Sequence, residues 1–136
     1  MNIALLAHDG KKELMVQFCI AYCGILSGHD ICATSATGNL VREATGLPIT
    51  LCAPCSQGGS QQIGARIAYN EIDLVLFFCD PYRENSRDVD SLARLCDQYS
   101  IPFASNVATA EVLIQGLRRG DLDWREIVNP KNRKNK

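Results

Sequence analysis

The sequence has 136 residues, of which 46% are hydrophobic and 21% are charged, and its formal net charge at pH 7 is −1. This length suits one domain with a buried core, and this charge balance gives no large field for drawing in nucleic acid or an anionic membrane, so we expect a small ligand. Residues 1–7 contain neither a basic region nor a long apolar run. We therefore expect no signal peptide, no membrane span and a cytoplasmic protein.

Apolar runs alternate with helical periodicity along the whole chain. In chain order, the pattern predicts a strand at residues 3–7, a helix at 14–25, a strand at 31–33, a helix at 40–45, a strand at 47–51, a helix at 63–69, a strand at 72–78, a helix at 89–99, a strand at 101–104 and a helix at 107–117. Such alternation implies right-handed crossovers. We therefore predict an α/β fold, a single doubly wound domain with a five-stranded, mostly parallel sheet between two helical layers. We expect it to cover residues 1–128, and the basic segment 129–136 to be a disordered tail.

Polar and glycine-rich segments follow the predicted strands. These segments are His8-Asp9, residues 34–37, residues 55–60, Asp80 and Ser105-Asn106. Ligands of doubly wound sheets bind beyond the carboxyl ends of the strands. The sequence therefore predicts a ligand site at this edge of the sheet.

Two features of these segments favour an anionic ligand. Residues 34–39, Thr-Ser-Ala-Thr-Gly-Asn, bring hydroxyl and backbone N–H groups to a helix N-terminus, where a phosphate would fit. A second interpretation is that Thr37 or a neighbour only caps the helix. Lys12 is predicted in the first turn of a helix, which is unfavourable for a cation unless an anion binds beside it. It can equally be a solvated surface lysine next to Lys11.

His8 and Asp80 are candidate groups for proton transfer. Imidazole suits proton transfer near neutral pH, and Pro81 ends a strand so that Asp80 faces the same edge. Each also has a structural interpretation, as a histidine of the packed interior and as an aspartate that only turns the chain. Gly58-Gly59 permits close backbone approach to a ligand, whereas Ser60 is equally a good N-cap for the next helix.

Five motifs follow one another along the chain in a defined order and at defined spacings. They are Ala7-His8-Asp9 with Lys12; Ala33-Thr34 through Thr37-Gly38-Asn39-Leu40; Gly58-Gly59 with Gln61-Gln62-Ile63-Gly64-Ala65; Phe77-Phe78 with Asp80-Pro81; and Ile101-Pro102 with Asn106-Val107-Ala108-Thr109-Ala110. In this arrangement residues 2–117 resemble methylglyoxal synthase. The same fold occurs as an allosteric domain of carbamoyl phosphate synthetase and in the purine-pathway cyclohydrolase, so the fold alone does not identify the function.

The resemblance implies a lyase that releases inorganic phosphate from dihydroxyacetone phosphate through an enediolate, giving methylglyoxal without a cofactor or a metal. It also implies a homohexamer that binds this substrate and inorganic phosphate, with no nucleic acid or membrane partner. The implied phosphate-binding residues are Lys12, Thr34, Ser35, Thr37, Cys55, Ser56, Gly58 and Gly59. The implied catalytic positions are His8, Asp9, Ser60, Asp80 and Asp88, with His8 polarising the carbonyl group or relaying protons and Asp88 just before the helix predicted from residue 89.

The sequence departs from this family at three places. The family has Asp, its principal proton-abstracting base, where this chain has Ser60, and a serine hydroxyl is a poor base at neutral pH. The family's phosphate-binding Ser-Gly aligns with Pro54-Cys55, and Ser56, one residue away, is its candidate replacement. The loop 82–87 is shorter than the family's and lacks its second histidine, which leaves Arg83 or Arg87 as candidate anion contacts.

Three functions are open at the level of the sequence. The first is a methylglyoxal synthase in which Asp88, Asp9 or Asp80 serves as the base. The second is a phosphate-binding regulatory protein that lost the proton chemistry, as Ser60 suggests. The third is a thiol redox protein, because Cys52-Ala53-Pro54-Cys55 has the spacing of a redox dithiol. The seven cysteines are odd in number and most lie in apolar runs, so we expect no disulfide framework.

Overall fold

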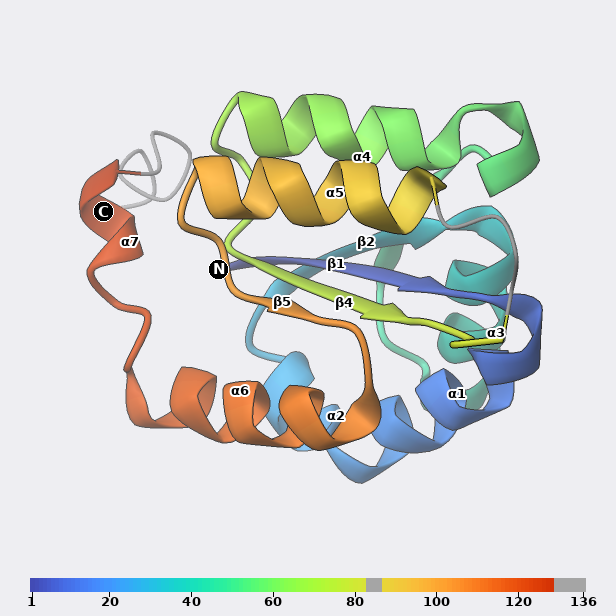
Figure 1. The fold of residues 1–136 in the computed structure, drawn as a ribbon. Coiled ribbons are helices and arrows are strands. Elements are labelled where there is room, and N and C mark those ends of the chain that lie inside the picture. Colours follow the sequence, from blue (N-terminus) through green and yellow to red (C-terminus); the bar gives the residue numbers. More distant parts are fainter. Residues whose placement is uncertain (83–86, 129–136) are drawn as a thin grey trace.

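The computed structural model describes residues 1–82 and 87–128, which contain a five-stranded sheet in the order β3-β2-β1-β4-β5 (Figure 1). The strands are β1 (Asn2–Ala7), β2 (Asp30–Thr34), β3 (Ile49–Cys52), β4 (Leu74–Phe78) and β5 (Phe103–Ala104). Every neighbouring pair is parallel, so the predicted α/β class and parallel sheet are confirmed. All strands therefore end along one side of the sheet, here called the carboxyl edge, which lies on the right in Figure 1.

Helices cover both faces of the sheet, as the doubly wound prediction requires. One face carries α1 (Lys12–Ala21), α3 (Ser35–Thr45) and α6 (Val107–Arg119), and the other carries α4 (Gly59–Ala68) and α5 (Arg87–Gln98) (Figure 1). Every residue of β1 and β4 is buried between these layers, which explains their nearly continuous apolar sequences.

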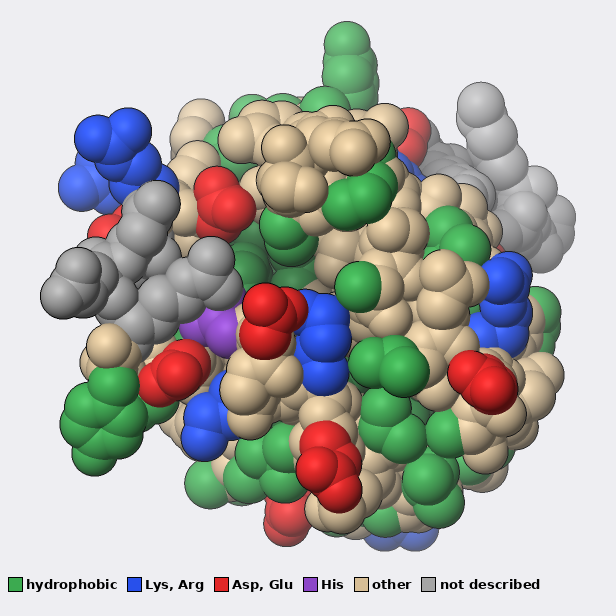
Figure 2. All heavy atoms as spheres, turned by 90° about the vertical axis from the view of Figure 1, so that its right-hand side faces the viewer, with side chains coloured by type: hydrophobic (Ala, Val, Ile, Leu, Met, Phe, Trp, Pro, Cys, Tyr) green, Lys and Arg blue, Asp and Glu red, His purple; other side chains and the backbone are tan. Residues whose placement is uncertain are grey.

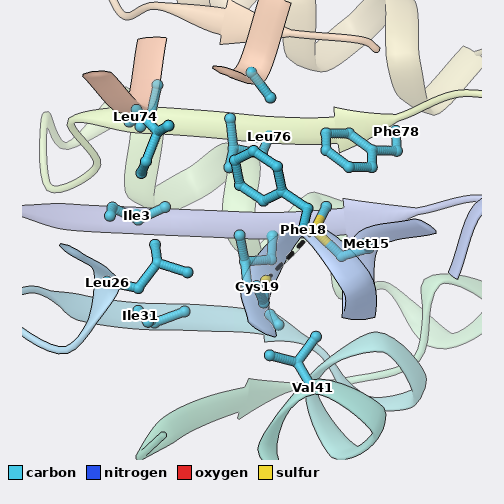
Figure 3. Packing of buried hydrophobic residues seen from close by; sticks show 14 of the residues in the cluster. Ile3, Met15, Phe18, Cys19, Leu26, Ile31, Val41, Leu74, Leu76 and Phe78 are labelled. Carbon is cyan, nitrogen blue, oxygen red and sulfur yellow. Dashed lines mark hydrogen bonds between the residues drawn. The ribbon is translucent and has the colours of Figure 1, made fainter. Parts of the chain in front are cut away.

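The larger core cluster lies on the face covered by α1, α3 and α6. Met15 and Phe18 of α1 and Val41 of α3 pack there against strand residues that include Ile3 and Phe78 (Figure 3). A second cluster on the other face joins α4 and α5 to the sheet through residues such as Ile63, Ile67, Leu92 and Cys96. Fixed helices on both faces hold the segments between them in defined positions at the carboxyl edge.

The segments at the carboxyl edge are more helical than the sequence predicts. The 3-10 helices η1 (Asp9–Lys11) and η2 (Cys55–Gln57) precede α1 and α4, and α4 starts four positions before its predicted start at residue 63.

Helix α3 starts directly after β2 rather than at residue 40, and ends at Gly46 as predicted, with φ of 75°. Thr37 and Gly38 are buried in its first turns, so packing overrides the low helix propensity of these residues. The predicted helix 14–25 is divided at Tyr22 into α1 and α2 (Cys23–Leu26).

The sequence does not predict α7 (Arg125–Val128), which begins with a fully buried arginine. Arg125 donates hydrogen bonds to Oδ1 of Asp73 at 3.0 Å, to Oδ1 of Asn70 at 2.8 Å and to the carbonyl oxygens of Ile72 and Ser100, both at 3.2 Å. Asn70 and Ser100 have φ of 57° and 55° and precede β4 and β5. Arg125 thus stabilises both left-handed turns at the side of the sheet opposite the carboxyl edge.

Some predicted features fall on residues that the structure does not describe. The predicted tail, residues 129–136, and Arg83 lie outside the described residues. Within residues 1–82 and 87–128, no helix combines the length and the apolar character needed to cross a lipid bilayer.

Candidate active site

A cavity of about 290 Å³ opens at the carboxyl edge, where residues near or beyond the ends of β1, β2, β3 and β4 meet. The predicted site residues that line it are His8, Asp9, Lys12, Thr34, Cys55, Ser56 and Asp88, together with Ala7, Ala36, Pro54 and Phe77. The predicted residues Ser35, Thr37, Gly58, Gly59, Ser60 and Asp80 do not line it. Figure 2 shows this side of the molecule, where acidic and basic side chains lie next to one another. The sequence does not predict that Phe77 lines the cavity, because the apolar strand that contains it has the pattern of any core strand.

His8 follows β1 and has its ring fixed by the neighbouring strand. Its backbone N–H donates to the carbonyl oxygen of Phe78 at 3.0 Å, and its Nδ1 accepts a hydrogen bond from the backbone N–H of Asp80 at 2.8 Å. The ring also contacts Phe77 edge to face, with 5.2 Å between centroids. A nitrogen that accepts a hydrogen bond carries no proton, so the ring is neutral with its proton on Nε2. His8 is therefore set up to donate a hydrogen bond from Nε2.

Lys12 begins α1 and lines the cavity with Asp9. Its ammonium group donates to the carbonyl oxygen of Ala7 at 3.0 Å and to Oδ1 of Asp9 at 2.8 Å. The Asp9 side chain is 97% exposed, whereas that of Lys12 is 19% exposed. Since an ammonium group has three donors, Lys12 retains one for an anion in the cavity. Asp9 thus forms an ion pair with this ammonium group at the cavity.

The N-terminus of α3 borders the cavity through Thr34 and Ala36. Thr34 is the N-cap residue, and within the described residues its side chain makes no capping hydrogen bond. Thr37 lies inside the helix, which excludes the interpretation that it is the cap. Its Oγ1 is buried and has no hydrogen-bond partner in the part of the chain that the structure describes. The first backbone N–H groups of α3 have no helical carbonyl acceptor, an arrangement that favours an anion beside Thr34.

The segment after β3 brings Cys55 and Ser56, but not Ser60, to the cavity. Gly58 is the N-cap of α4, with φ of 91°, so the interpretation of Ser60 as the N-cap is wrong. A Cβ at Gly59 would collide with the carbonyl oxygen of Ala53, which shows how closely α4 packs against the end of β3. Ser60 is buried in the first turn of α4 and donates to Oε1 of Gln61 at 3.2 Å. Its side chain is directed to a groove of about 540 Å³ between α4 and α5.

The two remaining carboxylates have different surroundings. Asp80 accepts a hydrogen bond from the backbone N–H of Tyr82 at 3.0 Å, and its own N–H holds His8. Asp88 is half-buried in the first turn of α5, inside the helix rather than before it, and it lines both the cavity and the groove that holds Ser60. Arg87 lines the groove but not the cavity. Asp88 is therefore the carboxylate best placed to act on a ligand in the cavity.

Comparisons with known proteins identify the family of this chain. The family model described as MGS-like domain matches residues 15–105. Over its whole length the chain is 60% identical to a methylglyoxal synthase of Caldicellulosiruptor saccharolyticus, of which the match covers 98%. Over 95% of its length it is 51% identical to a methylglyoxal synthase of Geobacillus thermodenitrificans, of which the match covers 91%. The chain belongs to the methylglyoxal synthase family.

A solved structure from the methylglyoxal synthase family shares the fold. The crystal structure of methylglyoxal synthase from Elizabethkingia anophelis matches with a TM-score of 0.78 and 37% sequence identity, over 83% of this chain and 76% of that chain. The resemblance seen in the sequence is thereby confirmed. The departure at Ser60 remains a feature of this chain, and the structure places that residue beside the same groove as Asp88.

Proposed function

We propose that this protein is a methylglyoxal synthase that eliminates inorganic phosphate from dihydroxyacetone phosphate in the cytoplasm. The observation that carries the proposal is one cavity lined by His8, Lys12, Thr34 and Asp88, in a chain 60% identical to a methylglyoxal synthase over its whole length. A neutral hydrogen-bond donor, a cation and a carboxylate are the groups that this elimination needs. No cofactor takes part in the proposed reaction.

The substrate phosphate binds between Lys12 and the N-terminus of α3. Lys12 contributes its remaining N–H donor and its positive charge, and α3 contributes backbone N–H groups beside Thr34. Ser56 lines the same cavity and replaces the hydroxyl that the family places at Pro54. Because phosphate is also the leaving group, these contacts stabilise it both before and after the carbon–oxygen bond breaks.

Asp88 and His8 carry out the proton chemistry. Asp88 takes a proton from the hydroxymethyl carbon, the C–H electron pair moves toward the carbonyl oxygen, and Nε2–H of His8 donates a hydrogen bond to that oxygen as its negative charge grows. The enediolate hydroxyl group then gives its proton to the departing phosphate and its carbon becomes the aldehyde carbonyl. The C=C electron pair shifts toward the carbon that bears the phosphate, and the ester oxygen leaves with the electron pair of the broken carbon–oxygen bond. The enolate that remains takes up a proton at its CH2 carbon and becomes methylglyoxal.

The test is to mix the purified protein with dihydroxyacetone phosphate and to follow methylglyoxal and inorganic phosphate together. We expect equal release of both products, and a loss of about 10²–10⁴-fold in kcat for His8→Ala and for Asp88→Asn. Asp97→Asn, which changes an exposed carboxylate at the other end of α5, is the matched control and is expected to keep full activity. If no product forms while phosphate still raises Tm, the cavity only binds phosphate and the enzyme proposal is wrong.

The resemblance also leads us to propose a homohexamer. In support, the described surface carries large exposed apolar side chains, among them Ile20 on α1 and Val112 on α6, which are 53% and 68% exposed. Sedimentation equilibrium of the full chain measures the mass of the assembly directly. A monomer at micromolar concentration would contradict this proposal without affecting the catalytic one.

A further inference from the structure

Two cysteines lie on neighbouring strands next to the site, offset by two residues in register. Cys32 of β2 pairs in register with Thr50 of β3, and Thr34 pairs with Cys52. Cys52 therefore lies two positions beyond the partner of Cys32, on the same face of the sheet. Both belong to the core cluster under α4 and α5, and the thiol of Cys32 makes a hydrogen bond to the side chain of Cys52.

This contact makes the two sulfurs chemically different. The hydrogen bond from Cys32 and the nearby positive charge of Arg66 outweigh burial and lower the pKa of Cys52 to about 6. Burial instead raises the pKa of Cys79 to about 11 and that of Cys96 to about 12. At neutral pH Cys52 is therefore mainly a thiolate, and it is half-buried, whereas Cys32 is a buried thiol at hydrogen-bonding distance.

We propose that Cys52 and Cys32 form a reversible disulfide when the protein meets hydrogen peroxide, which makes this pair a redox modification site. The Cys52 thiolate attacks one peroxide oxygen, the O–O bond breaks and hydroxide leaves, so that Cys52 becomes a sulfenic acid. The Cys32 sulfur then displaces the sulfenic hydroxyl and loses its proton, which gives the S–S bond and water. In total two thiols lose two electrons and two protons, and the peroxide is reduced to two water molecules.

Oxidation of this pair changes the candidate phosphate site. Residues offset by two positions on neighbouring strands have Cα atoms roughly 8 Å apart, which exceeds the usual Cα separation of a disulfide. Closing the S–S bond to about 2.05 Å therefore requires the two strands to shift against each other. Among the described residues, strand β3 is at the edge of the sheet and pairs only with β2, which leaves it the freer of the two to move. It continues into Pro54, Cys55 and Ser56, and β2 ends at Thr34, so that both strands lead to residues that line the cavity. We therefore expect the disulfide to weaken phosphate binding, a consequence that rests on the proposed function.

The disulfide is tested by treating the full chain with hydrogen peroxide, alkylating the remaining thiols and mapping the peptides by mass spectrometry. The expected product is one linked peptide pair, Cys32 with Cys52, which dithiothreitol separates. Cys52→Ser and Cys32→Ser abolish the link, and Cys23→Ser, which changes another half-buried cysteine on α2, keeps it. A link between Cys52 and Cys55, or a Cys52 that remains fully alkylatable after peroxide, would overturn the proposal.

The coupling to phosphate is tested separately, by the increase in Tm that inorganic phosphate causes in the reduced and the oxidised protein. We expect a smaller increase after oxidation, restored by dithiothreitol, and no change on peroxide treatment of Cys52→Ser. Equal increases would refute the coupling. If the reduced protein shows no increase at all, the phosphate site of the proposed function fails together with the coupling, while the mapped disulfide stands.

Discussion

The backbone N–H of Asp80 donates a hydrogen bond of 2.8 Å to Nδ1 of His8, which ties the end of β4 to the end of β1. Since β1 and β4 are adjacent parallel strands, this bond depends on the register of the sheet and not on a flexible side chain. It keeps the imidazole proton on Nε2 at the cavity. Asp80 thus serves the site through its main chain, which explains how it acts on the site without lining the cavity.

The fixed proton on Nε2 leads to a prediction for substitutions of His8. We expect His8→Gln to retain more activity than His8→Asn, because a glutamine amide N–H can replace the Nε2 donor and the shorter asparagine amide cannot reach it. His8→Ala should show the full loss in kcat of about 10²–10⁴-fold. Steady-state kinetics of the three variants check this order. Equal activity of His8→Gln and His8→Ala would show that a hydrogen-bond donor alone is not what His8 supplies.

The ion pair between Lys12 and Asp9 makes opposite predictions for its two members. Lys12→Met should weaken binding of inorganic phosphate by about tenfold to a hundredfold, as the loss of a hydrogen bond to a charged group costs about 1.5–3 kcal/mol. Asp9→Asn should tighten binding, because the carboxylate at 2.8 Å no longer competes with phosphate for the ammonium group. Isothermal titration calorimetry measures both. If Asp9→Asn instead abolishes turnover while phosphate still binds, Asp9 is the base and Asp88 is not.

Ser60 provides a test of where the base is located. Ser60 and Asp88 line the same groove, and Ser60 lies in the first turn of α4, where the helix N-terminus favours a carboxylate. We expect Ser60→Asp to restore kcat in the Asp88→Asn variant, by as much as about 10²–10⁴-fold if it replaces the base fully. Ser60→Asn in the same background adds the bulk without the charge and should restore nothing. If Ser60→Asp also restores nothing, position 60 cannot reach the substrate in this chain.

The sequence predicts the sheet well because its signals are local. The run 72–78 contains the buried strand β4, and Gly46 ends α3 with the positive φ that glycine permits. The predicted start of α3 is too late because Ser35, Thr37 and Gly38 have low helix propensity, and only their packing in the folded protein makes them helical. The predicted start of α4 is too late for the same reason, since α4 begins with Gly59, which packs against the end of β3.

Contacts between residues that are far apart in the sequence cannot be predicted from local sequence patterns. The spacing of Cys52 and Cys55 predicts a pair, but strand pairing brings Cys32 to Cys52 from twenty positions away. Phe77 forms part of the cavity wall although its sequence context is that of a core strand. Arg125 stands close to a basic polar tail, and its partners lie 25 to 55 positions before it, so no local pattern marks it as buried.

Arg125 leads to the last prediction, which concerns stability. Both side chains of its ion pair with Asp73 are 0% exposed. Arg125→Met leaves the Asp73 carboxylate buried without its partner, so we expect a loss of about 3–5 kcal/mol in the free energy of unfolding. Arg119→Met, which breaks an ion pair whose side chains are 60% and 55% exposed, is the control and should cost less than about 1 kcal/mol. Urea denaturation measures both variants.

The same experiment separates the charge from the packing of Arg125. Asp73 also accepts a hydrogen bond from the backbone N–H of Asn2 at 2.8 Å, and an asparagine at position 73 can keep that contact through its amide oxygen. Asp73→Asn in the Arg125→Met background should therefore recover part of the lost stability, because it removes the uncompensated buried charge. If the double variant is less stable than Arg125→Met alone, Arg125 stabilises the turns at Asn70 and Ser100 mainly through its own hydrogen bonds, and the buried charge of Asp73 is satisfied by other groups.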